Sequence, residues 1–304
     1  MATTSGSLVS ADARTFGAFS VGPLGFGCWR MTDSGDIGLA KQQAIIEAAL
    51  DVGMNLIDTA DVYGYGGAGF GANEVVLGQV LAASPGLRER MVLTTKGGIT
   101  PPMPYNSSYE YLISACEDSL RRLQVESVDL YQIHRPDLYT HPEEVARALI
   151  TLRESGKIGE VGVSNFVTHQ TDALAKFLPF PIATDQPQFS LTCLAPMRDG
   201  TLDRCMREGA VPLAWSPLAA GSLATGEGVS AELLAVIDGL AEREGVSRSA
   251  IALAFVLAHP SRPVALVGSQ KAERLADATT ALTVQLDRND VYALFQASEG
   301  VPLP

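Results

Sequence analysis

The feature that most limits the possible folds is a regular alternation of short apolar runs with helical stripes. Eight runs of strand length follow one another from residue 24 to residue 267, and at least one segment with apolar residues at helical spacing follows each run. Strands joined by helical crossovers must pair in parallel, because a two-residue hairpin cannot connect them. The expected strands are 24–29, 55–58, 91–96, 128–134, 158–163, 182–186, 211–215 and 264–267.

Eight such units close most economically into an α/β fold, the (β/α)8 TIM barrel. The competing architecture is an open doubly wound sheet, which predicts a Gly-x-Gly-x-x-Gly turn after the first strand. Gly25-Phe26-Gly27 does not extend into that turn, because position 30 is arginine. We also expect extra helices after the seventh strand and at the C-terminus, and a β-hairpin around residues 7–21 that closes the bottom of the barrel.

The length of 304 residues and the 46% hydrophobic content suit one large core. No proline-rich or serine-rich linker divides the chain. We therefore predict one domain over residues 1–304. It would consist of an N-terminal segment at 1–20, the barrel with its appended helices at 21–297, and a short tail at 298–304.

Charge and composition exclude several classes of partner. The net charge of −12 and a pI near 4.8 argue against a nucleic-acid surface, which requires a basic patch. The amino end lacks the pattern of a secretory signal, and no apolar run reaches about 18 residues, so no membrane partner is expected. Four dispersed cysteines without a Cys-x-x-Cys pair indicate reduced thiols in a cytoplasmic protein and no metal site. They are Cys28, Cys116, Cys193 and Cys205.

A polar or glycine residue stands at the carboxyl end of each predicted strand from the second to the eighth. Barrel enzymes place their catalytic groups at this end of the strands. The seven rim residues are Asp58, Lys96, His134, Asn165, Gln186, Ser216 and Gly268.

Three of these residues, together with Tyr63, have the chemistry of carbonyl reduction. An unpaired ammonium is costly to bury, so Lys96 is expected to pair with Asp58 on the adjacent strand. The ammonium is predicted to lower the pKa of Tyr63 from its reference of about 10, which would let the phenol exchange protons near neutrality. His134 would orient or polarise a carbonyl. These groups supply no hydride, so a redox reaction needs a nicotinamide cofactor.

The same four residues carry a resemblance to a known family. Within Asp58-Thr59-Ala60-Asp61-Val62-Tyr63-Gly64 and Ile133-His134-Arg135-Pro136-Asp137, they resemble the Asp-Tyr-Lys-His tetrad of the aldo-keto reductases. The resemblance extends from about residue 21 to residue 297. Gly27-Cys28-Trp29-Arg30-Met31 is similar to a bacterial subgroup with few characterised substrates. The resemblance implies that Tyr63 is the general acid/base and that Asp58, Lys96 and His134 complete the catalytic set.

The resemblance also implies a binding site for a nicotinamide dinucleotide. Ser164, Asn165 and Gln186 would bind the carboxamide, and Phe189 would stack on the nicotinamide. The segment 215–223 is similar to the family's pyrophosphate loop, and 268–274 to its site for the adenosine 2′-phosphate. The cofactor-binding residues so implied are Gly27, Cys28, Trp29, Ser164, Asn165, Gln186, Phe189, Ser216, Pro217, Leu218, Gly221, Leu223, Gly268, Ser269, Lys271 and Arg274.

Three positions depart from the family pattern. Asp185 replaces a common asparagine, Ala278 replaces an asparagine that touches adenine in many members, and Gly268 replaces a lysine that contacts the 2′-phosphate in some. Arg274, helped by Ser269 and Lys271, would then supply the charge recognition. NADP(H) is the expected cofactor because a guanidinium matches a phosphate well, and NAD(H) remains open.

We therefore predict an NAD(P)H-dependent oxidoreductase that interconverts aldehydes or ketones and alcohols, in a monomer or weak homo-oligomer. Candidate substrate residues are Trp29, Arg30, Tyr105 and Arg135. The alternative is a redox-sensing regulatory barrel that binds NADPH with little turnover. A metal-dependent hydrolase would need clustered His and Asp ligands on several strands, and His134 is the only histidine at a predicted strand end. The substrate and the favoured direction remain open.

Overall fold

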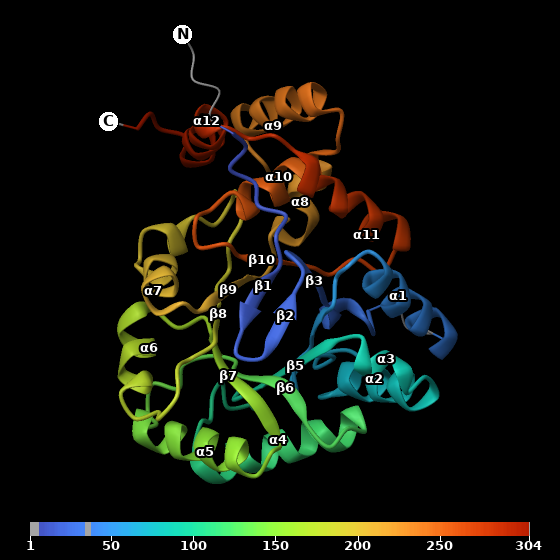
Figure 1. Cartoon of the computed structure of the whole chain (residues 1–304), viewed down its shortest axis with the longest axis vertical. Coiled ribbons are helices and arrows are strands. Elements are labelled where there is room, and N and C mark those ends of the chain that lie inside the picture. Colours follow the sequence, from blue (N-terminus) through green and yellow to red (C-terminus); the bar gives the residue numbers. More distant parts are fainter. Residues whose placement is uncertain (1–5, 34–37, 304) are drawn as a thin grey trace.

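The computed structural model describes residues 6–33 and 38–303. Eight parallel strands form a closed barrel in the order β10-β3-β4-β5-β6-β7-β8-β9. Figure 1 shows this barrel surrounded by helices, so the predicted TIM barrel is confirmed and the open sheet is wrong. The strands are β3 (Leu24–Gly27), β4 (Leu56–Asp58), β5 (Val92–Gly97), β6 (Val128–Ile133), β7 (Ile158–Ser164), β8 (Thr184–Gln186), β9 (Val211–Ala214) and β10 (Val264–Val267).

The bounds of the strands lie within two residues of those predicted. The largest changes affect the first strand, which ends at Gly27, and the sixth, which begins at Thr184. Residues Cys28–Arg30 form a 3-10 helix, η1, in place of the last strand residues. This early turn carries Trp29 and Arg30 out of the barrel wall and onto its rim.

Helices cover the outside of the barrel, as predicted. Ser230 begins α9 by accepting a hydrogen bond from the Leu233 amide, and Asp287 begins α12 with a capping box. The helices are α1 (Leu39–Asp51), α2 (Ala72–Ala83), α3 (Gly86–Glu89), α4 (Tyr109–Leu123), α5 (Pro142–Glu154), α6 (Thr168–Ala175), α7 (Thr201–Glu208), α8 (Ser222–Thr225), α9 (Ala231–Glu244), α10 (Arg248–Leu257), α11 (Ala272–Thr279) and α12 (Arg288–Glu299). Short 3-10 helices add η2 (Ala195–Met197), η3 (Ala219–Gly221) and η4 (Thr280–Thr283).

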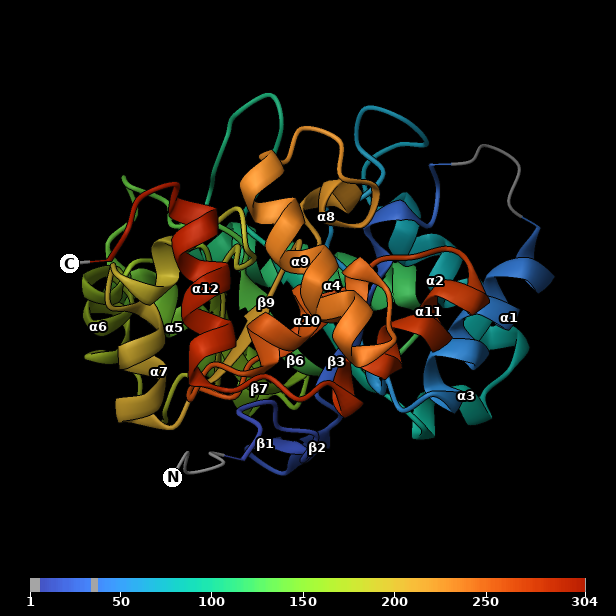
Figure 2. The ribbon, with the colours of Figure 1, turned by 90° about the horizontal axis from the view of Figure 1, so that it is seen from above.

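The N-terminal hairpin closes one end of the barrel. Its strands β1 (Arg14–Phe16) and β2 (Phe19–Val21) pair antiparallel. Phe16 and Val21 belong to an apolar cluster that includes Leu56, Val92 and Val211, which lie at the amino ends of barrel strands. Figure 2 shows the hairpin on the side of the barrel opposite the long loops, so the predicted hairpin and its closing role are confirmed.

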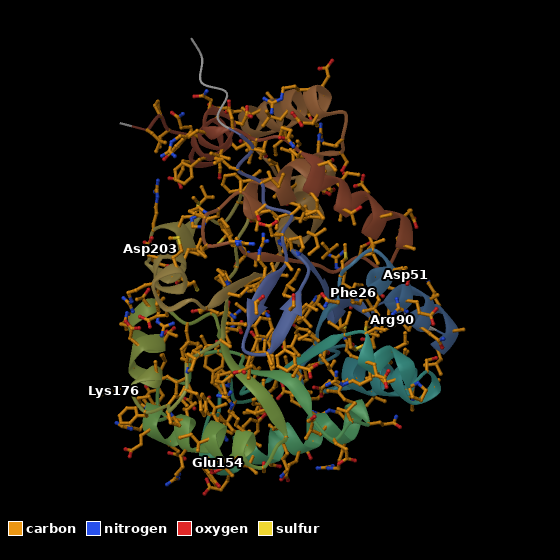
Figure 3. All side chains as sticks on the ribbon, viewed as in Figure 1. Phe26, Asp51, Arg90, Glu154, Lys176 and Asp203 are labelled. Carbon is orange, nitrogen blue, oxygen red and sulfur yellow. The ribbon has the colours of Figure 1, made fainter. Side chains whose placement is uncertain are left out.

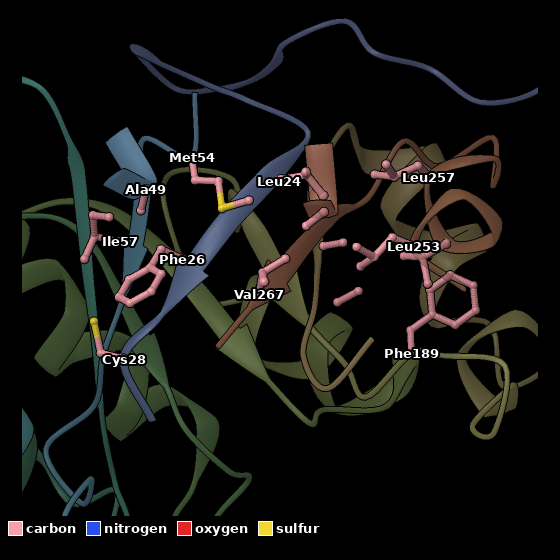
Figure 4. Packing of buried hydrophobic residues seen from close by; sticks show 14 of the residues in the cluster. Leu24, Phe26, Cys28, Ala49, Met54, Ile57, Phe189, Leu253, Leu257 and Val267 are labelled. Carbon is pink, nitrogen blue, oxygen red and sulfur yellow. The ribbon is translucent and has the colours of Figure 1, made fainter. Parts of the chain in front are cut away.

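The larger core lies between the barrel wall and the helices. It buries Phe26 and Ile57 from the strands against Met54 and Ala49, and it continues around to Leu253 on α10. Figure 4 shows this layer in close-up. Charged side chains lie on the outside: Asp51 at the end of α1 forms an ion pair with Arg90, the residue directly after α3 (Figure 3). Each strand is therefore covered on both faces, as expected of a parallel sheet.

Across the described residues, no helix combines the length and the apolar character that a membrane crossing needs. The organisation of residues 1–304 as one domain stays a prediction, and so do the bounds at 1–20, 21–297 and 298–304. Residues 1–5, 34–37 and 304 of those segments lie outside the described part of the chain.

Candidate active site

The strand register brings the predicted catalytic residues to one end of the barrel. Asp58 on β4 is level with Thr94 on β5, and Lys96 lies two residues further along β5. His134 follows β6 directly, and its amide donates to the carbonyl of Gly97, the last residue of β5. Three adjacent strands thus deliver three side chains to the same rim.

Lys96 is the centre of the hydrogen-bond network. Its Nζ donates to Asp58 Oδ2 at 2.7 Å, to the Thr59 carbonyl at 2.9 Å and to the Tyr63 hydroxyl at 3.1 Å. Lys96 is fully buried, and Asp58 is 2% exposed. An ammonium has three N–H donors, so this geometry uses all of them, and the predicted buried pair with Asp58 is present.

Tyr63 reaches the network from the turn after β4. Gly64, with φ of +98°, allows the chain to turn directly after the tyrosine, where a Cβ would lie 2.6 Å from the Gly69 carbonyl oxygen. The Tyr63 ring lies edge-on to Trp29, with centroids 4.9 Å apart, and to His134 at 5.8 Å. Tyr63 is 8% exposed, so the phenol that Lys96 holds has limited contact with water.

The predicted lowering of the Tyr63 pKa is wrong. Burial raises the pKa of Tyr63 above its ordinary value of 10.0, and the nearby Asp58 carboxylate raises it further. Lys96 acts in the opposite direction but does not outweigh them. Because Lys96 is already paired with Asp58, the phenol is next to an almost neutral pair rather than a free cation. Tyr63 is therefore protonated at neutral pH.

The pKa values of the two buried basic groups shift in opposite directions, although burial by itself lowers both. Burial lowers the pKa of Lys96, but attraction to Asp58 and Tyr63 outweighs it, so the pKa is raised and the ammonium is retained. His134 has no anionic partner of this kind: burial, then Lys96, then Arg135 lower its pKa well below 6.5. His134 is therefore a neutral imidazole, and its Nδ1 has no hydrogen-bond partner within the described residues.

Two amides hold the second oxygen of Asp58. Gln186 Nε2 donates to Asp58 Oδ1 at 3.0 Å, and Gln132 Nε2 approaches the same atom at 3.4 Å. Gln132 also donates to Thr94 Oγ1 at 3.0 Å. The sequence predicted Gln186 at the carboxamide site but did not indicate this contact with Asp58. Gln132 was not predicted at all, although it lies on β6 two residues before His134 and the alternation of side chains along a strand therefore turns both to the same side.

Ser164 and Asn165 continue the rim from β7. Ser164 Oγ donates to the Gln186 carbonyl at 2.9 Å, and Asn165 Nδ2 donates to the His134 carbonyl at 3.2 Å. Asn165 has a positive φ of 58°, and its Oδ1 accepts from the Trp215 indole at 3.0 Å. Trp215 is half-buried directly after β9. The sequence placed it only at the start of the pyrophosphate segment and did not indicate this contact with Asn165.

The structure does not support the predicted role of Phe189. Its side chain is fully buried, and its ring packs against Phe255 and His259 with centroids 6.1 and 5.9 Å away. Figure 4 shows Phe189 beside Leu253 in the outer core. A ring enclosed in this way has no face on which a ligand could stack. Trp215, fixed through Asn165, is the half-exposed aromatic at this part of the rim.

The segment after β9 has a strained backbone. Ser216, Ala219 and Ala220 have positive φ values of 52°, 49° and 56°, although none is glycine, and Gly221 follows at 107°. Such conformations are costly and concentrate at binding sites. Pro217 and Leu223 are buried and Leu218 is half-buried, so the apolar residues anchor the loop to the barrel. The predicted pyrophosphate segment is thus built as a fixed loop.

The segment after β10 leaves basic side chains uncovered. Lys271 and Arg274 lie at the start of α11, are exposed, and form no ion pair among the described residues. Ser269 Oγ accepts from the Lys271 amide at 3.3 Å. Gly268 lies beside Gly27, whose carbonyl would be 3.5 Å from a Cβ at 268. Ala278 is buried.

The predicted substrate residues do not all lie together. Trp29 is 60% exposed above Tyr63, Tyr105 is 37% exposed on the loop after β5, and Arg135 is half-buried next to His134. Arg30 instead donates to the Ala220 carbonyl at 2.9 Å, on the loop after β9. Cys28 is fully buried, so only its backbone is available to a ligand.

The donor set suits a nicotinamide dinucleotide. Amide and hydroxyl groups of Ser164, Asn165 and Gln186 lie beside the tetrad. Further around the rim comes the strained loop after β9. At the start of α11, Lys271 and Arg274 form no ion pair with any described residue. This order matches a ligand with a carboxamide at one end and phosphates at the other. The side-chain amide of Gln270, which lies between Ser269 and Lys271 in the chain, has buried Nε2 and Oε1 atoms without a hydrogen-bond partner among the described residues.

A closed eight-stranded barrel with a buried lysine, aspartate, tyrosine and histidine at its rim is the architecture of a barrel enzyme. The sequence model of the Aldo/keto reductase family matches residues 23–299. The chain therefore belongs to the aldo/keto reductase family. It is an oxidoreductase that acts on small carbonyl compounds and uses a nicotinamide cofactor.

Individual relatives agree with this assignment. The chain is 46% identical to 6-dehydroglucose reductase of Novosphingobium aromaticivorans, covering 94% of each chain. It is 35% identical to 6-dehydroglucose reductase of Agrobacterium fabrum, covering 90% of this chain and 93% of the other. Among solved structures, the glycerol dehydrogenase AKR11B4 of Gluconobacter oxydans aligns with a TM-score of 0.84 at 28% identity, covering 97% and 98% of the two chains.

Proposed function

We propose that the protein reduces a sugar aldehyde or related hydroxylated carbonyl compound with NADPH, with Tyr63 as the general acid. The observation that carries the proposal is the triple hydrogen bond of Lys96 to Asp58, Thr59 and Tyr63. It fixes one phenolic hydroxyl at the rim, beside a neutral histidine, in a site with limited contact with water.

Tyr63, Lys96 and His134 have distinct roles in the proposed reaction. Tyr63 donates its proton to the carbonyl oxygen as negative charge develops there. Lys96 keeps its hydrogen bond to the phenolic oxygen and stabilises the phenolate that remains. His134, being neutral, orients the carbonyl without competing for the proton. Reduced nicotinamide supplies the hydride when bound.

The cofactor assignments follow the order of the rim. Ser164 and Asn165 are proposed to hold the carboxamide, with Gln186 using its Oε1 because its Nε2 is occupied by Asp58. Trp215 takes the stacking role first given to Phe189. Arg274 and Lys271 are proposed to bind the 2′-phosphate. This favours NADPH over NADH, because a guanidinium and an ammonium without carboxylate partners gain most from a phosphate dianion.

The substrate class comes from the named relatives and suits the rim. Two relatives that align over nearly their full length are called 6-dehydroglucose reductases. This chain presents an exposed indole from Trp29 against the Tyr63 ring, a guanidinium from Arg135 directly after His134, and a phenol from Tyr105 on the loop after β5. An aromatic face beside hydrogen-bond donors suits a polyhydroxylated substrate better than an apolar one.

The test is a comparison of carbonyl substrates with purified protein. NADPH oxidation would be followed by absorbance with 6-dehydroglucose, with simple aliphatic aldehydes and with ketosteroids. We expect the highest kcat/KM for the sugar aldehyde. A preference for the steroids would contradict the substrate class, and stopped-flow traces without NADPH oxidation for any carbonyl would favour the redox-sensing alternative.

A further inference from the structure

Arg30 points away from the tetrad although it follows Trp29 directly. The Trp29 ring lies against Tyr63, whereas Arg30 Nη2 donates to the Ala220 carbonyl at 2.9 Å. Ala220 belongs to the strained loop after β9, and Arg30 to the turn after β3. These strands are not neighbours, because β10 lies between them. The Arg30 side chain therefore crosses the carboxyl-terminal end of β10.

The base of Arg30 is fixed by a buried amide. Asn73 Nδ2 donates to the Cys28 carbonyl at 2.7 Å and to the Trp29 carbonyl at 3.0 Å. Asn73 is fully buried at the start of α2. The guanidinium is held at its other end by Ala220, so the side chain is anchored at both ends.

The loop that Arg30 reaches has little capacity of its own to bind an anion. Five successive amides, from residue 219 to residue 223, already donate within the loop, to Ser216, Leu218 and Ala219. The sequence also contains no lysine or arginine from residue 208 to residue 242. These five amides are therefore not free to donate to a diphosphate lying against the loop. The loop also has no cationic side chain to bind it.

Arg30 can supply the missing charge. A guanidinium has five N–H donors, and among the described residues Arg30 uses only the bond to Ala220 and forms no ion pair. Arg248 also approaches this region, at the Thr225 carbonyl, but its guanidinium is engaged by both oxygens of Asp238.

We propose that Arg30 binds the diphosphate of the dinucleotide cofactor and holds it against the loop after β9, rather than contacting the carbonyl substrate. This inference rests on the proposed function, because it requires a dinucleotide to cross the rim from the tetrad to α11. The Arg30 guanidinium would keep its hydrogen bond to the Ala220 carbonyl, and its remaining N–H donors would bind the phosphates.

The test compares Arg30→Ala, Arg30→Gln and Arg30→Lys with the parent protein by calorimetric titration of NADPH, NADH and ADP-ribose. All three ligands share the diphosphate, so Arg30→Ala should raise every Kd by the same factor, about tenfold. Arg30→Gln keeps a donor for Ala220 without the charge and should lose nearly as much. Arg30→Lys keeps the charge without the fork and should lose less. The differences in Kd between the parent protein and the variants should become smaller at higher salt concentration, because salt screens the attraction between the guanidinium and the diphosphate.

Arg135→Ala is the matched control, since it removes another rim arginine. We expect it to raise the KM of the carbonyl substrate and to leave the three Kd values unchanged. The proposal is overturned if Arg30→Ala behaves like this control, or if it weakens NADPH alone, which would place Arg30 at the 2′-phosphate. If the parent protein binds none of the three ligands, the proposed function fails as well, so the two failures are distinguishable.

Discussion

Asp185 is a buried carboxyl group with no adequate partner. It lies on β8 with its side chain fully buried, and its Oδ1 has no hydrogen-bond partner within the described residues. Thr171 Oγ1 approaches Oδ2 at 3.5 Å. Burial raises the pKa of Asp185 from its ordinary value of 3.8 to about 7, although Arg204 and Thr171 act in the opposite direction. Asp185→Asn is therefore predicted to stabilise the protein above neutral pH.

The size of the effect follows from the pKa values. The difference between 3.8 and about 7 is about three pH units, and each unit corresponds to about 1.4 kcal/mol. Because the folded-state pKa is raised, the folded protein binds the proton more tightly than the unfolded chain does. Stability from this group is thus greatest below pH 4, falls as the pH rises to about 7, and is constant above it. The asparagine resembles the neutral acid, so the variant should gain up to about 4 kcal/mol at pH 8 and almost nothing at pH 4.

The assay is denaturant unfolding of both proteins at several pH values between 4 and 8, with a check that the dependence on denaturant concentration is unchanged. Asp203→Asn is the matched control, because Asp203 is exposed on α7 and undergoes the same chemical change. The control should alter stability little at any pH. Equal stabilisation of Asp185→Asn at pH 4 and pH 8, or a loss at pH 8, would refute the reasoning.

Four further predictions concern the tetrad and the cofactor. Tyr63→Phe should abolish carbonyl reduction and leave the Kd of NADPH nearly unchanged, since it removes only the proton donor; a large loss of affinity would show that Tyr63 is misplaced. Lys96→Met should lower the free energy of unfolding by about 3–5 kcal/mol, because Asp58 is left charged and buried, and adding Asp58→Asn should recover part of this loss. Arg274→Ala should weaken NADPH far more than NADH in titrations, whereas equal weakening would contradict the 2′-phosphate assignment. Reduction should continue at a nearly constant rate to about pH 9 and alcohol oxidation should rise with pH, because the pKa of Tyr63 is above 10.0; a fall in reduction near pH 7 would argue against Tyr63 as the acid.

The positions of the tetrad could be predicted because strand ends leave a clear signal in the sequence. The runs that end at Asp58 and Lys96 are apolar or β-branched up to the polar residue, and parallel pairing then places those residues on one rim. The contact of Lys96 with Asp58 follows from the cost of burying either charge alone. These inferences depend on local pattern and topology, which a single sequence contains.

Side-chain direction in the loops could not be predicted in the same way. Phe189 and Trp215 both follow barrel strands closely, yet Phe189 enters the core beneath α10 and Trp215 remains at the rim. The difference depends on the packing of Phe255 and on the hydrogen bond from Trp215 to Asn165. Both are contacts between residues far apart in the chain. Arg30 is a similar case, since its partner Ala220 is 190 residues away.

The sign of the Tyr63 pKa change had to come from the balance of burial and charge. An ammonium 3.1 Å from a phenol would lower the phenol pKa if it were the only charge nearby. Asp58, however, lies 2.7 Å from the same ammonium and is itself held by Gln186. The pair presents little net charge to Tyr63, and burial then decides the direction. Lys96 still lowers the pKa of the resting tyrosine, but not by enough to outweigh burial. In the proposed reaction, its attraction matters most when proton transfer leaves negative charge on the phenolic oxygen, as a transition-state role requires.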